Sequence, residues 1–213
     1  MRRVPARRGC GRRFAESESG IATLEFVLIV PILIAMVYGV AEYVNVADHR
    51  DKVSALARTL ADLTSQNSTG QATDEEMKLN RGSAGPILAP FDANQAIIQI
   101  SSVGVNANNA NYICSTWALD PKKEITRIVG KDKSLVVPDN FKRAGARYVL
   151  AEVKMTYQPL FGSVLRRLLP TFKLDFNWSE SVAWPVRGGK SLGTGQDAEI
   201  VMPGGKACDP KAT

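Results

Sequence analysis

The sequence predicts an α+β protein in which one long N-terminal helix packs on a small antiparallel sheet. Two observations support this fold class. An apolar run at 21–41 continues directly into an amphipathic pattern that ends near residue 66, and apolar residues recurring at helical spacing are typical of a helix that buries one face. Beyond residue 95, segments of alternating apolar and polar residues are separated by turn-forming sequences, as in a sheet with one buried face.

The apolar run has the length and composition of a transmembrane helix. Its 21 residues carry a single charge, on Glu25. A helix of this length measures about 31 Å, close to the thickness of the hydrocarbon core of a bilayer. Pro31 lies inside the run and is expected to kink the helix. A secretory signal peptide is the competing interpretation, but its apolar region is shorter and ends at a small-residue cleavage site. We therefore expect a retained membrane helix over 21–44.

The positive charge of the chain is concentrated at its N-terminus. Residues 1–20 hold six Arg against Glu16 and Glu18, a net charge of +4 out of +6, so the rest of the chain carries only +2. A basic segment directly before an apolar span indicates a cytoplasmic leader, with the following domain on the other side of the membrane. The nearly neutral remainder has no basic patch of the kind that binds nucleic acid, so no nucleic-acid partner is predicted.

Two helical segments are expected after the membrane span. The amphipathic pattern predicts an extension of the first helix over 45–69, with its end among the turn-forming residues 65–70. The sequence Thr73-Asp-Glu-Glu76 has the form of a capping box, with Thr at the N-cap and Glu three residues later. A short helix should therefore follow over 74–82.

Four segments have the pattern of strands, and they lie at 95–105, 112–119, 148–157 and 172–184. The Asn-rich residues 106–111 predict a turn that joins the first two strands into a hairpin. Residues 160–169 are expected to form a short apolar helix or loop that packs on the sheet. Together, residues 70–187 are expected to form one α+β domain.

The three cysteines differ in the compartment that we expect for them. Cys10 lies in the cytoplasmic leader, whereas Cys114 and Cys208 lie on the oxidising side of the membrane, where disulfides form. A disulfide between Cys114 and Cys208 is our working hypothesis, and two separate thiols are the alternative. The Gly-, Lys- and Pro-rich residues 188–213 predict a flexible tail, unless Cys208 holds it in place.

The sequence offers no constellation for catalysis or cofactor binding. Gly189-Lys190-Ser191 resembles the end of a phosphate-binding loop, but Trp184 stands where that motif requires a glycine. His49 is the single histidine and lies on the amphipathic helix, without a cluster of other ligands at suitable spacing. We therefore predict no enzyme, no metal site and no small-molecule cofactor.

Glu25 is the most informative residue of the apolar run. A carboxylate inside a membrane helix is costly unless it has a partner, and such residues are candidates for a functional role. Because Glu25 lies only four residues inside the span, it can extend to the membrane interface. Alternatively, a cut after Gly20 would give Ile21 a free α-amine. That amine would lie one helical turn from Glu25, or would reach Glu25 of a neighbouring subunit.

These residues resemble the processing site of type IV prepilins and, more narrowly, the TadE/TadG family of tight-adherence (Flp) pilus proteins. The resemblance is carried by Gly20-Ile-Ala-Thr-Leu-Glu25-Phe26, by Val30-Pro31 and by Gly39-Val-Ala-Glu42. In type IV prepilins a membrane aspartyl peptidase cuts after the glycine, which implies a cut between Gly20 and Ile21 here. Ile21 stands where many pilins have an aromatic residue. The closing sequence Ala183-Trp-Pro-Val-Arg187 also looks like the periplasmic part of these proteins.

The resemblance implies a pilin-like fold and a structural function. The chain would be a minor pilin or pseudopilin, anchored in the bacterial inner membrane, that helps to assemble a Flp pilus in adhesion or secretion. Glu25 would set the register of its helix against those of other pilins. The implied partners are other pilins, the pilus assembly platform and a prepilin peptidase. The alternative is an unprocessed periplasmic binding or adhesin module tethered to the membrane.

Overall fold

The computed structural model describes residues 18–119, 127–131, 135–159, 162, 167, 175–191 and 197–208. The chain divides into two compact units, residues 1–45 and residues 46–213, and each unit is considered by itself. Residues 1–17 of the expected leader lie outside the described residues, as does most of the expected apolar segment 160–169.

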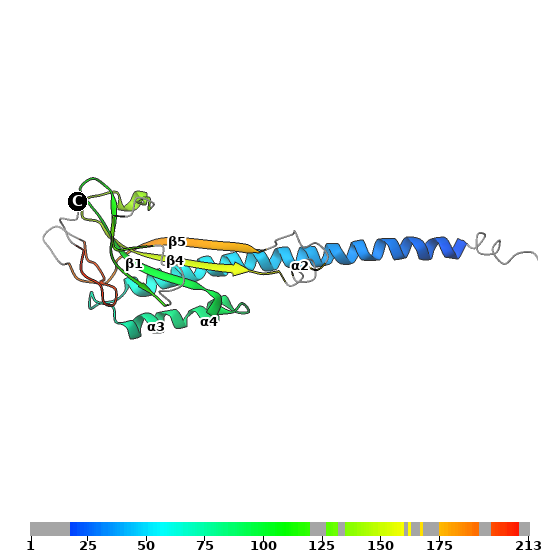
Figure 1. The fold of residues 1–213 in the computed structure, drawn as a ribbon, viewed down its shortest axis with the longest axis horizontal. Helices are drawn as coiled ribbons and strands as arrows, with labels where there is room; N and C mark the ends of the chain where they lie inside the picture. The colour runs from blue at the N-terminus through cyan, green and yellow to red at the C-terminus, as the bar shows by residue number, and fades with distance from the viewer. Residues whose placement is uncertain are drawn as a thin grey trace, which may run out of the picture. The chain divides into compact units, whose positions relative to one another are not determined.

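The N-terminal part of the chain forms one long helix, α2, which spans Glu18–Ser65 and contains Pro31 (Figure 1). The helix stops where the turn-forming residues begin. There the side-chain oxygen of Asn67 accepts hydrogen bonds from the backbone N–H groups of Thr69 and Gly70, each at 3.0 Å. Gly70 adopts a positive φ of 74°, which glycine tolerates without strain. The predicted end of the helix is therefore confirmed.

The expected short helix is α3, which spans Asp74–Gly82. Its capping box is complete: the backbone N–H of Glu76 donates to the hydroxyl of Thr73 at 3.2 Å, and the backbone N–H of Thr73 donates to the Glu76 carboxylate at 2.9 Å. Each bond satisfies a backbone donor that the helix itself leaves unpaired. The short helix α4, Ala84–Leu88, and the 3₁₀ turn η1, Ala93–Gln95, then lead to the sheet.

The sheet is antiparallel and has the strand order β3-β2-β1-β4-β5. Its strands are β1 (Ile97–Val105), β2 (Asn111–Ala118), β3 (Gly130–Lys131), β4 (Arg147–Tyr157) and β5 (Phe176–Pro185). A 3₁₀ turn, η2 (Asp139–Phe141), precedes β4. The predicted α+β fold is confirmed, and so is the hairpin between β1 and β2. The two-residue strand β3 was not expected, because so short a segment shows no alternation.

The main core lies between the C-terminal part of α2 and one face of the sheet. Val53, Leu56 and Leu60 of α2 are fully buried and belong to one cluster with Ile100 of β1 and Val149 of β4. Buried side chains of α3 and α4 join this cluster. On the other face of the sheet, a second cluster includes residues of β4 and β5 that alternate with those of the first cluster. The amphipathic half of the helix is thus explained by burial against the sheet.

Residues 197–208 form a segment that we name the C-terminal strap, and this part of the expected tail packs against the rest of the domain. Ile200 and Met202 are fully buried. Val201 exchanges backbone hydrogen bonds of 2.9 Å with the segment after α2, since Ala72 N–H donates to its carbonyl and its own N–H donates to the carbonyl of Gly70. The apolar run Ile-Val-Met inside a polar, glycine-rich sequence therefore gives the strap enough buried surface to pack.

The glycine pair that resembles a phosphate-binding loop has a structural role. A Cβ atom at Gly188 would lie 2.3 Å from the carbonyl oxygen of Asn67, so only glycine allows this close approach. The backbone N–H groups of Arg187 and Gly188 both donate to the carbonyl of Ser65, at 3.0 and 2.8 Å. The end of β5 thereby satisfies an otherwise unpaired carbonyl at the C-terminus of α2.

Candidate functional site

Gly20, Ile21 and Glu25 lie in the first two turns of α2 and are all exposed. Ile21 and Glu25 are four residues apart, so they share one face of the helix. Within the described residues, Glu25 has no hydrogen bond and no salt bridge. The geometry therefore places the backbone nitrogen of Ile21 about 6 Å along the helix axis from Glu25, at a rise of 1.5 Å per residue.

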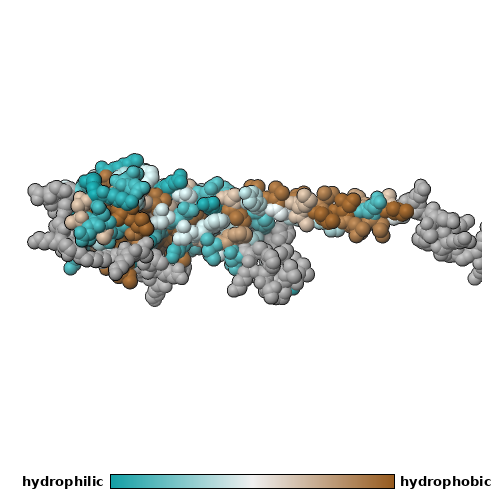
Figure 2. Space-filling model, turned by 90° about the horizontal axis from the view of Figure 1, so that it is seen from above, coloured by the Kyte–Doolittle hydropathy of each residue, from teal (hydrophilic) through white to brown (hydrophobic). Residues whose placement is uncertain are grey.

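The apolar stretch that surrounds Glu25 is not covered by any other described part of the chain. The large side chains at 21–40 are mostly more than half exposed, and apolar residues gather along this helix (Figure 2). The helix is long and apolar enough to cross a membrane. A soluble protein rarely leaves so large an apolar surface bare, so this stretch fits contact with lipid or with the helices of other membrane proteins.

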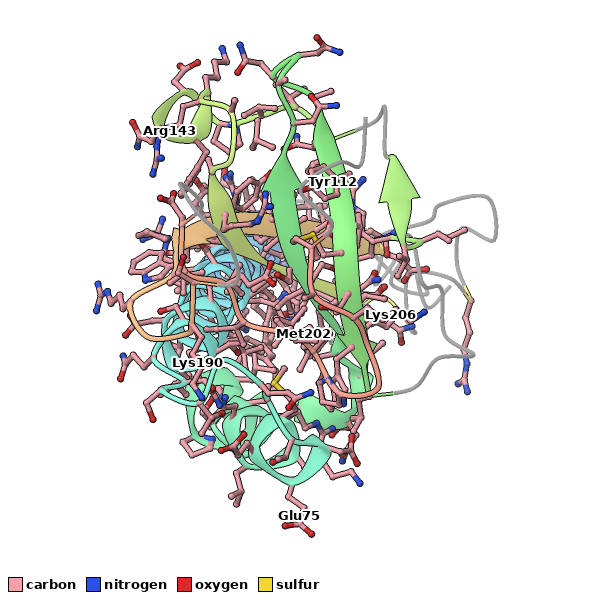
Figure 3. All side chains as sticks on the ribbon, turned by 90° about the vertical axis from the view of Figure 1, so that its left-hand side faces the viewer. Glu75, Tyr112, Arg143, Lys190, Met202 and Lys206 are labelled. Atoms are coloured by element: carbon pink, nitrogen blue, oxygen red, sulfur yellow. A yellow bond between two sulfur atoms is a disulfide. The ribbon has the colours of Figure 1, made fainter. Side chains whose placement is uncertain are left out.

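Cys114 of β2 and Cys208 of the strap are joined by a disulfide (Figure 3). Their Cα atoms are 4.8 Å apart, within the range that a disulfide requires. Both cysteines are buried and pack with Tyr112. The bond joins residues that are 94 positions apart, so it holds the strap against the sheet.

A buried ion pair, which the sequence analysis did not predict, lies beside the disulfide. The Arg147 Nε atom is 3.5 Å from a carboxylate oxygen of Glu199, and their side chains are only 1% and 3% exposed. The backbone N–H of Cys208 donates to both Glu199 oxygens, at 3.2 and 3.1 Å. The Arg147 guanidinium also lies 5.5 Å from the centre of the Tyr112 ring. Burial raises the pKa of Glu199, and the bond from Cys208 and the charge of Arg147 oppose this shift.

His49 occupies an aromatic cluster. Its ring centre is 4.6 Å from that of Phe91 and 5.3 Å from that of Tyr157. The side chain is buried, and neither ring nitrogen has a hydrogen-bond partner in the part of the chain that the structure describes. Burial lowers the pKa of His49, against the opposing charge of Asp48. Among the described residues, no group of His, Cys, Asp and Glu side chains could hold a metal ion.

The burial of His49 predicts that the stability of the protein depends on pH. The folded state binds a proton at His49 less tightly than the unfolded chain, whose His pKa is about 6.5. The contribution of neutral His49 to the free energy of unfolding is therefore complete above about pH 6.5, and it is lost as the pH falls below that value. The His49→Leu variant should lose less stability at acid pH. The slope of its free energy of unfolding against pH should differ from that of the wild type by up to about 1.4 kcal/mol per pH unit.

Denaturant unfolding of the full-length protein in detergent, followed by tryptophan fluorescence between pH 7 and 5, measures this difference. Glu199 has the opposite sign: its raised folded-state pKa adds stability at acid pH that is lost as the pH rises through that value. This contribution is the same in both proteins, so it cancels in the comparison. Equal slopes for the wild type and His49→Leu would contradict the assignment.

Residues 20–62 match the family model described as TadE-like protein, and these residues all lie within α2. The match confirms the resemblance predicted from the sequence and indicates involvement with tight-adherence pilus systems. No curated protein and no solved structure matches the chain.

Proposed function

We propose that this chain, whose residues 20–62 are TadE-like, is a membrane-anchored minor pilin that helps to assemble a tight-adherence pilus. The observation that carries the proposal is the coincidence of the family match with an apolar helix that the rest of the described chain leaves uncovered. Pilin subunits associate through such helices, so an exposed apolar helix has a clear use in this function.

In this proposal the chain has a defined orientation in the inner membrane. Residues 1–20 form a basic leader in the cytoplasm, residues 21–44 cross the membrane, and the domain that follows lies in the periplasm. The excess of arginine before the apolar helix supports this orientation. The disulfide between Cys114 and Cys208 also fits the periplasm, where disulfides persist.

Processing of the leader gives Glu25 its role. A prepilin peptidase cuts between Gly20 and Ile21, and the new α-amine of Ile21 is positively charged. In the low-dielectric membrane, this amine attracts the Glu25 carboxylate of the same or a neighbouring subunit. A pair between neighbouring subunits forms at only one relative height of their parallel helices, so it sets their register. Other pilins and the assembly platform are the partners in this step.

Deletion of the gene for this protein in its host tests the proposed role in pilus assembly. A deletion strain should carry far fewer surface pili than its parent, and the wild-type gene supplied in trans should restore them. The measurement is an immunoblot of the major pilin in the fraction sheared from the cells. Normal piliation of the deletion strain would contradict an assembly role.

A further inference from the structure

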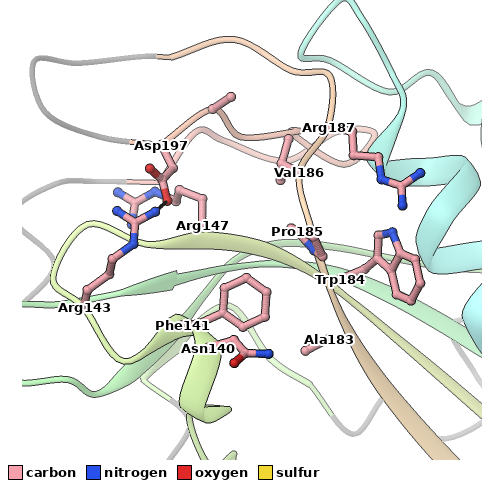
Figure 4. A pocket seen from close by; sticks show the side chains of 11 residues that line it. Asn140, Phe141, Arg143, Arg147, Ala183, Trp184, Pro185, Val186, Arg187 and Asp197 are labelled. Atoms are coloured by element: carbon pink, nitrogen blue, oxygen red, sulfur yellow. Dashed lines mark hydrogen bonds and ion pairs between the residues drawn. The ribbon is translucent and has the colours of Figure 1, made fainter.

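The second unit contains a pocket of about 670 Å³ near the end of β5 (Figure 4). Three separate segments form it: the η2 turn with the start of β4, the end of β5, and the start of the strap. The lining residues include Phe141, Arg143, Arg147, Trp184, Arg187 and Asp197. A pocket of this size can hold a few side chains of a partner.

The rim of the pocket carries guanidinium groups that carboxylates already hold in place. Arg143 pairs with Asp197, and Arg187 pairs with Asp62 at 3.0 Å. The Arg143 and Arg187 side chains nevertheless remain 62% and 55% exposed. A guanidinium has five N–H donors and one carboxylate uses at most two of them well. The two arginines are therefore oriented and still able to bind a further carboxylate.

The floor of the pocket is apolar. Phe141 stacks on Tyr148 with 4.6 Å between the ring centres, and Trp184 lies under the guanidinium of Arg187 at 5.6 Å. Both lining rings are half-buried. Tryptophan and arginine together are the residues that most often dominate the energy of protein interfaces. The pocket is thus suited to a carboxylate that stands next to an apolar side chain.

The same molecule presents such a pair of side chains on α3. Of the three acids in its first turn, Asp74 pairs with Lys78 at 2.5 Å and Glu76 serves the capping box. Glu75 has no hydrogen-bond or salt-bridge partner among the described residues. Leu79, one helical turn further on, is 77% exposed. Glu75 and Leu79 therefore form an acidic and apolar face that nothing in the described chain covers.

We propose that the Glu75–Leu79 face of one copy docks into the arginine-rimmed pocket of a second copy. Glu75 would pair with Arg143, the more exposed of the two arginines, and Leu79 would contact the Phe141 and Trp184 rings. Glu75 and Arg143 lie on opposite sides of the second unit (Figure 3), so a copy cannot fill its own pocket. Each contact leaves one face and one pocket unused, so the contact can repeat head-to-tail.

This inference concerns contacts between copies and does not rest on the proposed pilus function. Photo-crosslinking of the full-length protein in detergent micelles tests it, with Leu79 replaced by p-benzoylphenylalanine. Crosslinked dimers should form, and mass spectrometry should locate the crosslink in the peptides that contain Phe141 or Trp184. Crosslinks that map elsewhere, or none at all, would overturn the proposal. In cells, a crosslink to a different protein in place of a second copy would overturn it as well.

Charge reversal adds a sharper test to the same measurement. Glu75→Arg should lower the yield of dimer about tenfold, because like charges then meet at the rim. Asp51→Arg is the matched control, since Asp51 is also an exposed helical acid, and it should leave the yield unchanged. Mixing Glu75→Arg, which carries the photo-reactive group, with Arg143→Glu should restore the crosslink between the two variants. Failure of this mixture to restore it, while both variants stay folded by thermal melting, would refute the pairing.

Discussion

The Glu25→Ala variant should enter the membrane as the wild type does and should fail to assemble pili. Insertion depends on the apolar residues around position 25, and removal of a charge makes it easier. Assembly depends on the pair between the Glu25 carboxylate and the α-amine of Ile21. Without the carboxylate, the amine stays charged and unpaired between apolar helices. Breaking a buried pair in this way costs about 3–5 kcal/mol, so assembly should fall at least about 100-fold.

Two measurements on the same cells separate insertion from assembly. Membrane fractionation should recover Glu25→Ala in the amount of the wild type, whereas the sheared pilus fraction should be nearly empty. Glu25→Asp is the matched control, because it keeps the negative charge on a shorter side chain and should retain part of the assembly. If Glu25→Ala formed normal numbers of pili, the role assigned to Glu25 would be wrong.

Loss of the disulfide should destabilise the domain that follows the apolar helix by about 2–5 kcal/mol. Replacing both Cys114 and Cys208 with Ser frees the strap, which carries the buried residues Ile200 and Met202 and the Glu199 partner of Arg147. A free strap allows water to reach this ion pair and exposes the sheet face beneath it. Both effects destabilise the folded state. The unfolded state also gains chain entropy when it is no longer cross-linked, and this adds to the loss of stability.

Chemical unfolding of the full-length protein in detergent measures this loss. The three tryptophans, at 117, 178 and 184, all lie in the second unit, so their fluorescence follows the domain and not the membrane helix. Cys10→Ser is the matched control and should unfold as the wild type does. A loss of less than about 0.5 kcal/mol in the double variant, the size of an ordinary surface substitution, would show that the strap is held without the bond.

The helix and the strands could be predicted because their signals are local. The apolar run, the amphipathic continuation and the capping box at Thr73 are each visible within a few turns of sequence. The alternation at the end of β4 matches its burial, since Val153 and Met155 are buried whereas Lys154 is less so. The fold class follows from these patterns. The strand bounds differed from prediction by a few residues at most where the structure describes them.

The strap, the ion pair and the pocket could not be predicted because they depend on contacts between distant segments. Ile200 and Met202 are buried in one cluster with side chains of α2 and of the sheet, which are far away in the sequence. Arg147 meets Glu199 across 52 residues of sequence, as their numbers show. His49 likewise looked like an ordinary helix residue, since Phe91 and Tyr157 bury it from other elements. Composition indicated a flexible C-terminal tail unless Cys208 held it in place, and only the structure shows that residues 197–208 pack against the domain with Cys208 bonded to Cys114.

The N-terminus of the mature protein tests the central claim most directly. The claim is that a peptidase removes the leader, and that the new α-amine of Ile21 then pairs with the Glu25 carboxylate. N-terminal sequencing of the protein extracted from its native membrane should begin at Ile21, followed by Ala22 and Thr23. The Gly20→Val variant, which blocks the cut, should keep the leader. A wild-type protein that still begins at Met1 would contradict the claim, because no amine would then exist at Ile21.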